Sequence, residues 1–378
     1  MKPPAPLSVL DLVPVSSGST AAQALRNTAE LARRTEEFGY RRYWLAEHHL
    51  NPGVAGTTPA LVIQLVAQAT RTIRVGSGAV QLGHHTPLAV VEQFGLLDAL
   101  FPGRIDLGLG RSGAPRTGPG GGPPPPAAPP EPGRHTPEGL YIPPRFTGFA
   151  RLIHSPRFRL QLGLLQQPKA ETPDYAEQID DILALFAGTY TDGEAEAVAV
   201  PGAGADVAVW VLGSSGGQSA EVAGERGLPF AANYHVSPGT VLEAVEAYRA
   251  AFRPSAALAE PYVLVSADAV VAPDDGTARE LAAGYAPWVR SIRSAEGAMP
   301  FPTPEEAARL PWTDEERALV ADRVDTQFVG SPGTVAKGLA TLRDATGADE
   351  LLITTITHGH EDRVRSYELL ARAWAATA

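Results

Sequence analysis

Short apolar segments alternate with longer amphipathic segments along most of the chain. The apolar segments are rich in valine, leucine and isoleucine, which is typical of buried β-strands. They predict eight strands, at residues 7–13, 42–46, 73–80, 104–110, 206–212, 228–233, 261–267 and 350–355.

Helices are predicted where apolar residues recur at a spacing of three or four. These segments lie at residues 20–38, 59–70, 87–100, 173–186, 218–226, 238–252, 277–292, 332–346 and 361–376. Strands that are each followed by a helix favour an α/β fold, a closed (β/α)8 barrel (TIM barrel) in one domain spanning residues 1–378. An open, doubly wound parallel sheet stays the alternative.

Two stretches interrupt this order. Residues 113–170 form a long insertion after predicted strand four, and residues 112–144 hold proline and glycine in large excess. No periodic apolar face can form there, so we expect the insertion to be partly disordered. A second proline-rich stretch, residues 295–312, follows predicted strand seven and is expected to be a lid-like loop. Both follow strands, which places them at the C-terminal face, where barrel active sites are built.

Glu47, His48 and His49 come directly after predicted strand two. Neighbouring side chains of an extended segment point to opposite sides, so at most one of the two histidines faces the barrel mouth. A histidine there titrates near neutral pH and can move protons. A structural histidine held by hydrogen bonds is an equally weighted alternative.

A turn rich in serine and glycine follows predicted strand five and opens into a helix, at residues 213–219. Its small residues expose backbone N–H groups, its hydroxyls donate, and a helix N-terminus favours an anion. The turn therefore predicts phosphate binding. An ordinary loop in which a serine caps the helix is the alternative.

Other motifs are weaker. Gly76 and Gly78 allow a backbone to approach a flat ligand closely. Residues 108–113 match the dinucleotide-binding pattern G-x-G-x-x-G, but a proline-glycine tract follows instead of a helix, so we reject that interpretation. Arg111 stays a candidate anion contact. Residues 233–235 are candidates for a substrate pocket, with ordinary loop packing equally weighted.

Histidines at positions 84, 85, 358 and 360, together with 48 and 49, raise the question of a metal site. No acidic residue lies at a convincing spacing from them, so we predict that the chain binds no metal.

Composition excludes several classes of function. The absence of cysteine excludes disulfides and thiol nucleophiles, and a net charge of −11 argues against nucleic acid as a partner. No apolar run is long enough to span a membrane, and no signal-like apolar segment lies near residue 1, so we expect a cytoplasmic protein. Lysine is rare while arginine and alanine are abundant, which is typical of a GC-rich genome.

Taken in order, several motifs resemble the luciferase-like, flavin-dependent monooxygenases. They are YWLAEHH at 43–49, IRVGSG at 73–78, Thr86-Pro87 with Glu92, LDALFPGR at 97–104 before GLGR at 108–111, WVLGSS at 210–215 with 220–229, and FVGSP at 328–332. The likeness covers nearly the whole chain except about residues 113–170. Each motif is weak alone, but their ordered succession is specific.

The resemblance implies a (β/α)8 barrel, commonly a homodimer, that takes reduced FMN from a separate flavin reductase. With O2 it would form a flavin 4a-peroxy species that oxygenates a small hydrophobic substrate. His48 matches the histidine linked to this chemistry, and the Gly78–Ala79 bond matches a cis peptide under the flavin ring. The residues implied to bind the cofactor are Glu47, Ser77, Gly78, Ala79, Arg111, Val211, Gly213, Ser214, Ser215 and Ser219.

The chain departs from the family pattern in two places. Ser215 or Gly216 stands where the luciferase catalytic subunit has an acid, and the insertion after strand four is unusual, so no aldehyde specificity is implied. The GC-rich composition favours a tailoring step on a natural product, such as an aromatic polyketide in antibiotic biosynthesis. Hydroxylation, epoxidation and Baeyer–Villiger insertion stay equally open.

Three alternatives to this function stay open. One is hydride transfer with a deazaflavin on the same fold. The others are a metal-dependent barrel hydrolase and a non-catalytic flavin-binding relative.

Overall fold

The computed structural model describes residues 4–111, 132–148, 152–167 and 170–377. Its centre is a closed, all-parallel barrel, because β5 pairs with β10 and joins the two ends of the strand order β10-β11-β12-β14-β1-β2-β3-β5. The strands are β1 (Leu7–Asp11), β2 (Arg42–Leu45), β3 (Arg74–Ser77), β5 (Ile105–Gly110), β10 (Ala208–Gly213), β11 (Phe230–Asn233), β12 (Val263–Val271) and β14 (Glu350–Thr354). The prediction of a (β/α)8 barrel is confirmed.

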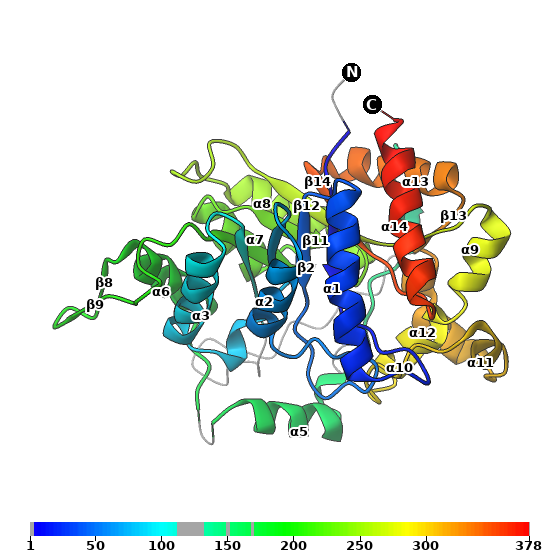
Figure 1. Cartoon of the computed structure of the whole chain (residues 1–378), viewed down its shortest axis with the longest axis horizontal. Helices are drawn as coiled ribbons and strands as arrows, with labels where there is room; N and C mark the ends of the chain where they lie inside the picture. Colours follow the sequence, from blue (N-terminus) through cyan, green and yellow to red (C-terminus); the bar gives the residue numbers. More distant parts are fainter. Residues whose placement is uncertain (1–3, 112–131, 149–151, 168–169, 378) are drawn as a thin grey trace.

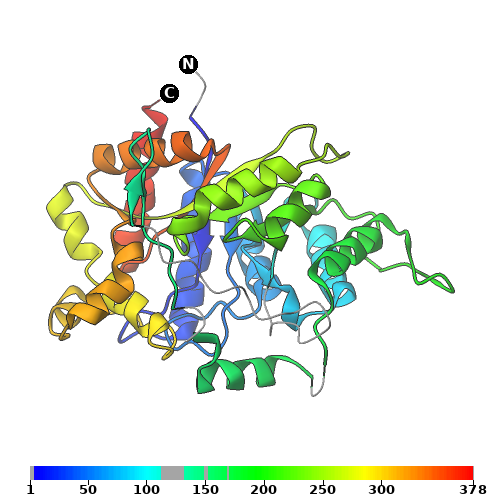
Figure 2. The ribbon, with the colours of Figure 1, turned by 180° about the vertical axis from the view of Figure 1, so that it is seen from behind.

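Helices follow the strands and surround the barrel (Figures 1 and 2). They are α1 (Ala21–Glu37), α2 (Pro59–Ala69), α3 (Pro87–Leu100), α6 (Tyr175–Ala187), α7 (Gln218–Glu225), α8 (Val241–Ala251), α13 (Pro332–Thr346) and α14 (His360–Ala375). Figure 1 places both termini at one end of the barrel and α5 (Pro156–Leu165), α10 (Tyr285–Arg293) and α12 (Asp314–Val324) at the other. The chain enters β1 from the end with the termini, so the strands' C-terminal ends open towards these three helices.

Side chains alternate along the strands between two apolar cores, as the period of a β-strand requires. One core fills the barrel and includes Leu10, Trp44, Trp210, Leu264 and Leu352. The other lies between barrel and helices and includes Val9, Tyr43, Val211, Val265 and Ile353. The rings of Trp44 and Trp210 meet edge to face inside the barrel, with centroids 5.1 Å apart.

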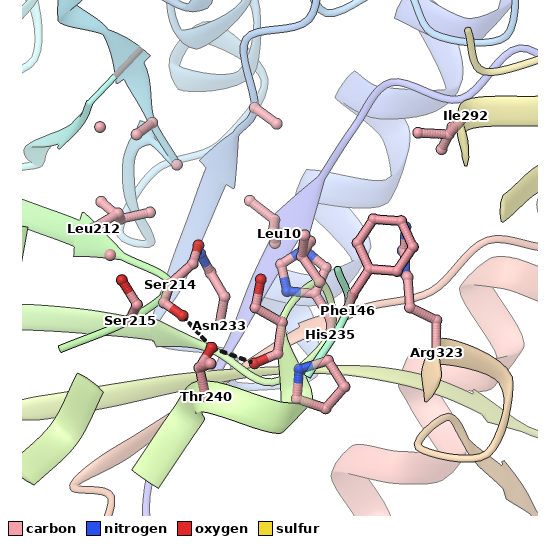
Figure 3. Close-up of a pocket in the computed structure, with 18 of the residues that line it drawn as sticks. Leu10, Phe146, Leu212, Ser214, Ser215, Asn233, His235, Thr240, Ile292 and Arg323 are labelled. Atoms are coloured by element: carbon pink, nitrogen blue, oxygen red, sulfur yellow. Dashed lines mark hydrogen bonds between the residues drawn. The ribbon is translucent and has the colours of Figure 1, made fainter. Parts of the chain in front are cut away.

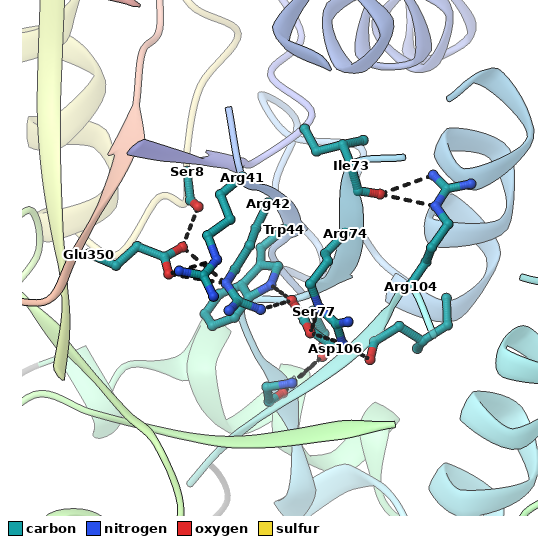
Figure 4. A network of polar contacts seen from close by, with 12 residues as sticks. Ser8, Arg41, Arg42, Trp44, Ile73, Arg74, Ser77, Arg104, Asp106 and Glu350 are labelled. Carbon is teal, nitrogen blue, oxygen red and sulfur yellow. Dashed lines mark hydrogen bonds and ion pairs between the residues drawn. The ribbon is translucent and has the colours of Figure 1, made fainter. Parts of the chain in front are cut away.

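A buried network of charges closes the other end of the barrel (Figure 4). Arg42 Nη1 lies 2.7 Å from Asp106 Oδ2, and Arg42 Nε lies 3.0 Å from Glu350 Oε1. Arg74 Nη2 is 2.7 Å from Asp106 Oδ1. These groups stand at or next to the first residues of β14, β2, β3 and β5, so they hold these strands in register at the face associated with barrel stability.

Three predicted elements differ from the structure. The strand predicted at 73–80 is interrupted after Ser77 and continues as β4 (Val80–Gln81). The helix predicted at 277–292 is two helices, α9 (Asp275–Leu281) and α10. Gly284 lies between them, and a Cβ there would stand 2.6 Å from the Phe301 ring, so the turn needs glycine.

The stretch at 295–312 contains the short helix α11 (Pro304–Ala308) and the fully buried Phe301. Beyond it, α12 and the strand β13 (Phe328–Gly330) were not predicted. The missed α12 carries two residues of the pocket described below.

The described part of the insertion comprises residues 132–148 and 152–167. It forms an antiparallel hairpin of β6 (Arg134–His135) and β7 (Tyr141–Ile142), followed by α5. Residues 113–131, 149–151, 168 and 169 of the insertion lie outside the described residues, so its expected partial disorder stays a prediction. A second small hairpin, β8 (Tyr190–Thr191) and β9 (Glu196–Ala197), follows α6. Within the described ranges, no helix combines the length and the apolar character needed to cross a bilayer.

Candidate active site

A pocket of about 730 Å³ opens at the C-terminal ends of the barrel strands. Its volume falls in the range of sites that hold cofactors and small organic molecules. Figure 3 shows Ser214, Ser215 and Thr240 at one end of it and Phe146 and Arg323 at the other. The pocket therefore has two ends of different chemistry, one rich in hydroxyls and one aromatic and cationic.

The hydroxyl-rich end is the turn predicted to bind phosphate. Ser214 and Ser215 follow β10, and Ser219 lies in the first turn of α7; all three line the pocket. The N-cap of α7 is Gly217, which has no side chain to cap the helix. Backbone N–H groups at a helix start that no side chain caps form a favourable site for an anion.

Neighbouring side chains fix the shape of this turn. Asn233 Nδ2 donates to Ser214 Oγ at 3.0 Å, and the Thr240 hydroxyl donates to the Ser214 carbonyl. Glu243 Oε1 accepts from Gly216 N at 3.2 Å. A Cβ at Gly216 would stand 2.9 Å from Glu243 Cγ, so a larger residue there would displace this side chain.

Positive charge lies beside the turn. Arg111 follows β5, is exposed, lines the pocket and donates from Nη1 to Gln218 Oε1 at 3.4 Å. Arg145, from the insertion, also lines the pocket. Two guanidinium groups next to an uncapped helix start fit a phosphate group.

His48 lines the pocket from the segment that follows β2. Its Nδ1 is buried and has no hydrogen-bond partner among the described residues. Burial lowers the pKa of His48 to about 4; Glu47 opposes this, while His49 and Arg323 add to it. The imidazole is therefore neutral near pH 7 and can accept a hydrogen bond or a proton from a ligand.

Glu47 lies behind His48 rather than in the pocket wall. Its Oε1 accepts hydrogen bonds from His49 Nε2 at 2.8 Å and from His85 Nε2 at 2.9 Å. Burial alone would raise the pKa of Glu47, but these hydrogen bonds outweigh it and lower the pKa to about 2. The carboxylate is thus charged and anchors the segment that carries His48.

The Gly78–Ala79 peptide bond is cis, as the resemblance implied, and both residues line the pocket. A Cβ at Gly78 would stand 2.8 Å from Leu10 Cδ1 inside the barrel, so the backbone rests directly on the barrel core. Ser77 is fully buried, and its hydroxyl bonds to both the carbonyl and the N–H of Gly108 at 2.9 Å. Ser77 therefore ties β3 to β5 beneath the pocket.

The structure brings most of the predicted site residues together. Those that line the pocket are His48, Gly78, Ala79, Arg111, Gly213, Ser214, Ser215 and Ser219. Glu47, Ser77 and Val211 are not part of that lining. Their side chains lie behind this lining. The side chain of Val211 points from β10 towards the surrounding helices. Ser77 bonds to β5, and Glu47 bonds to neighbouring loop residues. Their predicted contact with a cofactor stays a prediction.

Sequence reasoning missed the aromatic and cationic end. Arg323 lines the pocket from α12, Trp288 and Arg293 from α10, and Phe146 from the insertion. One signal was available for α12: Thr313 and Glu316 form a capping box, a pattern visible in the sequence at the start of that helix. That Arg323 is buried could not be read from the sequence.

His235 and Asn233, left open by the sequence, do line the pocket, whereas Tyr234 turns away and donates to the Tyr141 carbonyl at 2.7 Å. His235 Nδ1 lies 2.5 Å from Ser266 Oγ. Burial, with Arg323 and His48 nearby, lowers the pKa of His235 to about 3. The pocket thus holds two neutral imidazoles.

Two more of the histidines considered for a metal site, His358 and His360, lie close to protein groups. His358 Nε2 lies 3.1 Å from the Ser17 carbonyl, and His360 Nε2 lies 3.3 Å from Glu30 Oε2. Within the part of the chain that the structure describes, no three histidine, aspartate or glutamate side chains are grouped so that they could hold a metal ion. The hydrolase alternative has no supporting site there.

Comparison with known proteins identifies the family. The model of the luciferase-like monooxygenases matches residues 6–350. The chain belongs to the luciferase-like monooxygenase family. It is 37% identical over 371 residues to the uncharacterized protein YvbT of Bacillus subtilis, covering 97% of this chain and 96% of the relative. It is 32% identical over 362 residues to a luciferase-like monooxygenase of Escherichia coli, covering 96% and 95%.

Solved structures agree with this assignment. The crystal structure of apo-MsnO8 superimposes with a TM-score of 0.76 and 30% identity, covering 98% of this chain and 97% of that one. Two further solved structures have lower sequence identity, and their similarity supports only the fold assignment. One is the oxygenating constituent of 3,6-diketocamphane monooxygenase in complex with FMN, with a TM-score of 0.64 and 18% identity over 98% of both chains. Another is an F420-dependent secondary alcohol dehydrogenase, with 0.61 and 13% over 98% and 99%.

The residues of the pocket fit a flavin-type cofactor that carries a phosphate group. The uncapped start of α7 with its serines and Arg111 suits a phosphate, and the flat backbone at Gly78–Ala79 suits a planar ring. The buried Nδ1 of His48 has no partner among the described residues, so it can form a hydrogen bond with a polar ligand atom.

Proposed function

We propose that the chain is an FMN-dependent, two-component monooxygenase that oxygenates a small hydrophobic substrate. The observation that carries this proposal is one continuous pocket that joins the Ser214–Ser215 turn to His48 across the barrel mouth. A cofactor with a phosphate tail and a flat ring accounts for the Ser214–Ser215 turn and for the wall formed by Gly78, Ala79 and His48.

Each pocket residue has a defined task in this proposal. Ser214, Ser215, Ser219 and the start of α7 hold the phosphate, and Arg111 neutralises its charge. The backbone of Gly78 and Ala79 supports the ring. Reduced FMN, when bound, supplies the two electrons with which one atom of O2 enters the substrate and the other leaves as water.

In this arrangement His48 acts as a general base and then as a general acid. Its neutral imidazole can accept a proton at Nδ1, which has no partner among the described residues, and return it later. Glu47 fixes the segment carrying the ring through His49 and His85. His48 is thus proposed as the catalytic residue and Glu47 as a positioning residue.

Apolar side chains close the rest of the pocket and favour a hydrophobic substrate. They include Leu10, Leu12, Val54, Trp288 and Ile292. Such a wall excludes water from the reacting groups. A natural product such as an aromatic polyketide remains the proposed setting, and cytoplasmic location remains proposed with it.

Hydride transfer with a deazaflavin is the second candidate, because the F420-dependent alcohol dehydrogenase shares the fold. The same turn and helix start would hold a phosphate of either cofactor. Comparing affinities for reduced FMN and reduced deazaflavin separates the two candidates.

The chain is further proposed to receive FMN from a separate reductase and to form a homodimer. Large exposed leucines on two adjacent helices, α2 and α3, support self-association: Leu61, Leu65, Leu88, Leu96 and Leu100. Exposed apolar patches commonly mark protein contacts. Sedimentation gives the mass in solution, and a monomer at all concentrations would contradict this part.

The test of the proposed function starts with anaerobic titration of the purified chain with reduced FMN. Candidate substrates are then supplied with ¹⁸O2, and the products are analysed by mass spectrometry. We expect FMN binding and one ¹⁸O atom per product molecule. Failure to bind reduced FMN at micromolar concentrations would reject the proposal.

A further inference from the structure

The pocket end away from the phosphate-binding turn contains a buried guanidinium, that of Arg323. Its residue is only 7% exposed, and it lines the pocket from α12. Figure 3 shows it beside Phe146 and His235, across the pocket from Ser214 and Ser215. Arg323 therefore does not contact a phosphate that is bound at Ser214.

The guanidinium is only partly satisfied by the protein. Its Nη2 donates to Tyr285 Oη at 3.0 Å and lies 3.6 Å from Asp268 Oδ2. Its Nε is buried and has no hydrogen-bond partner within the described ranges. Buried donors without partners are costly and uncommon, so a free one in a pocket wall points to a ligand.

Trp288 adds a second donor of the same kind. It lines the pocket, and its Nε1 is also buried without a partner among the residues described. The Arg323 guanidinium lies over the Trp288 ring, 5.6 Å from its centroid. This end of the pocket thus offers N–H donors, and it calls for a ligand that carries acceptors.

Arg293 lines the same pocket, but its guanidinium is bound by protein groups. It too is 7% exposed, but its Nη2 lies 2.7 Å from Asp322 Oδ2, and its Nη1 donates to the Leu319 carbonyl at 2.5 Å. Its guanidinium also stacks 3.9 Å from the Phe146 ring centroid. Arg293 is thus engaged within the protein, whereas the Nε of Arg323 has no partner among the described residues.

We propose that Arg323 binds the carboxylate of an organic-acid substrate whose apolar body lies against Trp288 and Ile292. This proposal rests on the proposed function, because it names the substrate class of the same pocket. The planar fork of a guanidinium matches a carboxylate, and hydrogen bonds between charged groups are the strong ones. The apolar lining then determines which acids fit.

Asp268 is the internal competitor for Arg323. Burial raises the pKa of Asp268 to about 6, although Arg323 opposes that rise. At 3.6 Å, the ion pair is longer than a well-formed charged hydrogen bond. A substrate carboxylate can therefore draw the guanidinium away from Asp268, which keeps its hydrogen bond from Tyr285.

The test compares an acid with its neutral isostere, phenylacetate against phenylacetamide, by ligand-observed NMR at pH 7.5. The full chain is used as wild type, Arg323→Met, Asp268→Asn and Arg290→Met. Arg290 is the matched control, because it stacks on Trp312 and lies outside the pocket lining. FMN affinity and thermal unfolding are measured for every variant.

The wild type and Arg290→Met are expected to prefer the acid by at least about tenfold, equivalent to about 1.4 kcal/mol, since only the acid offers the guanidinium a charged hydrogen bond. Arg323→Met should abolish the preference without changing FMN affinity. Asp268→Asn should increase it, because Arg323 then has no competing charge. This opposite sign keeps the test decisive even if Arg323→Met is poorly folded.

Equal binding of acid and amide by the wild type, or an unchanged preference in both Arg323→Met and Asp268→Asn, would overturn the carboxylate proposal. The FMN titrations are independent of that result. If FMN binds and the acid is not preferred, the substrate proposal alone fails. If FMN does not bind, the proposed function fails whatever the acids do.

Discussion

Glu47 and Gln81 are joined twice: Gln81 N donates to Glu47 Oε2 at 2.8 Å, and Gln81 Nε2 donates to the Glu47 carbonyl at 2.5 Å. This pair ties the segment that carries His48 to the segment that follows Gly78 and Ala79. Two parts of the pocket wall are therefore held together by one buried residue, Glu47.

Replacing Glu47 by Gln should disturb the pocket although Glu47 is not part of its lining. The charged hydrogen bonds from His49 and His85 are lost, which should lower the free energy of unfolding by about 1.5–3 kcal/mol. FMN affinity should fall about tenfold, equivalent to about 1.4 kcal/mol. Urea unfolding and FMN fluorescence titration measure the two effects, with the exposed Glu92→Gln as control. Wild-type values for both would remove the positioning role.

Arg111→Ala should weaken binding of FMN by about 1–2 kcal/mol, since solvent screens the charge of this exposed side chain. Riboflavin lacks the phosphate, so its affinity should not change. Fluorescence titration with both ligands makes the comparison, and Arg226→Ala, on an exposed ion pair with Asp180, serves as control. A similar loss for riboflavin would place Arg111 away from the phosphate.

Most of the barrel could be predicted from the sequence, because each strand is a short apolar segment and most are followed by an amphipathic helix. Ser214, Ser215 and His48 were predicted for the same reason: each follows a recognisable strand within a short motif. The Gly78–Ala79 cis bond came from the family resemblance alone.

Arg323 could not be predicted, because its place depends on packing between distant segments. The helix that carries it, DEERALVADRV, is mostly charged and is typical of a solvated surface. Burial of Arg323 follows from Asp268 on β12 and Tyr285 on α10, neither of which is near it in sequence. Phe146 was missed for a similar reason, since it lies in the irregular insertion.

Acid should destabilise the fold through His235, which is 8% exposed. Burial lowers its pKa from 6.5 to about 3, so below pH 6.5 the unfolded chain takes up a proton that the folded chain does not. The free energy of unfolding should therefore fall as pH drops from 6.5 towards 3, by up to about 1.4 kcal/mol per pH unit.

His235→Asn should flatten this dependence, whereas replacing the exposed His135 by Gln should not. Urea unfolding at pH 7.5, 6.0 and 5.0 measures the slopes. Parallel slopes for the wild type and His235→Asn would show that this histidine is not buried in its neutral form.

Asp106→Asn tests the closed end of the barrel separately from the pocket. Asp106 faces Arg42, Arg74 and Trp44 Nε1, and its loss should lower the free energy of unfolding by about 3–5 kcal/mol, because buried cations lose their partner. Asp344→Asn, on an exposed pair with Arg343, should change it by less than about 0.5 kcal/mol. Chemical denaturation gives both values, and equal small effects would contradict the role of the network.

The most direct measurement of the central claim is a crystal structure of the chain with FMN. We expect the phosphate within hydrogen-bond distance of Ser214, Ser215 or Ser219, and the ring over Gly78 and Ala79 beside His48. A flavin bound elsewhere, or one that reaches the serine turn while its ring points away from His48, would contradict the account.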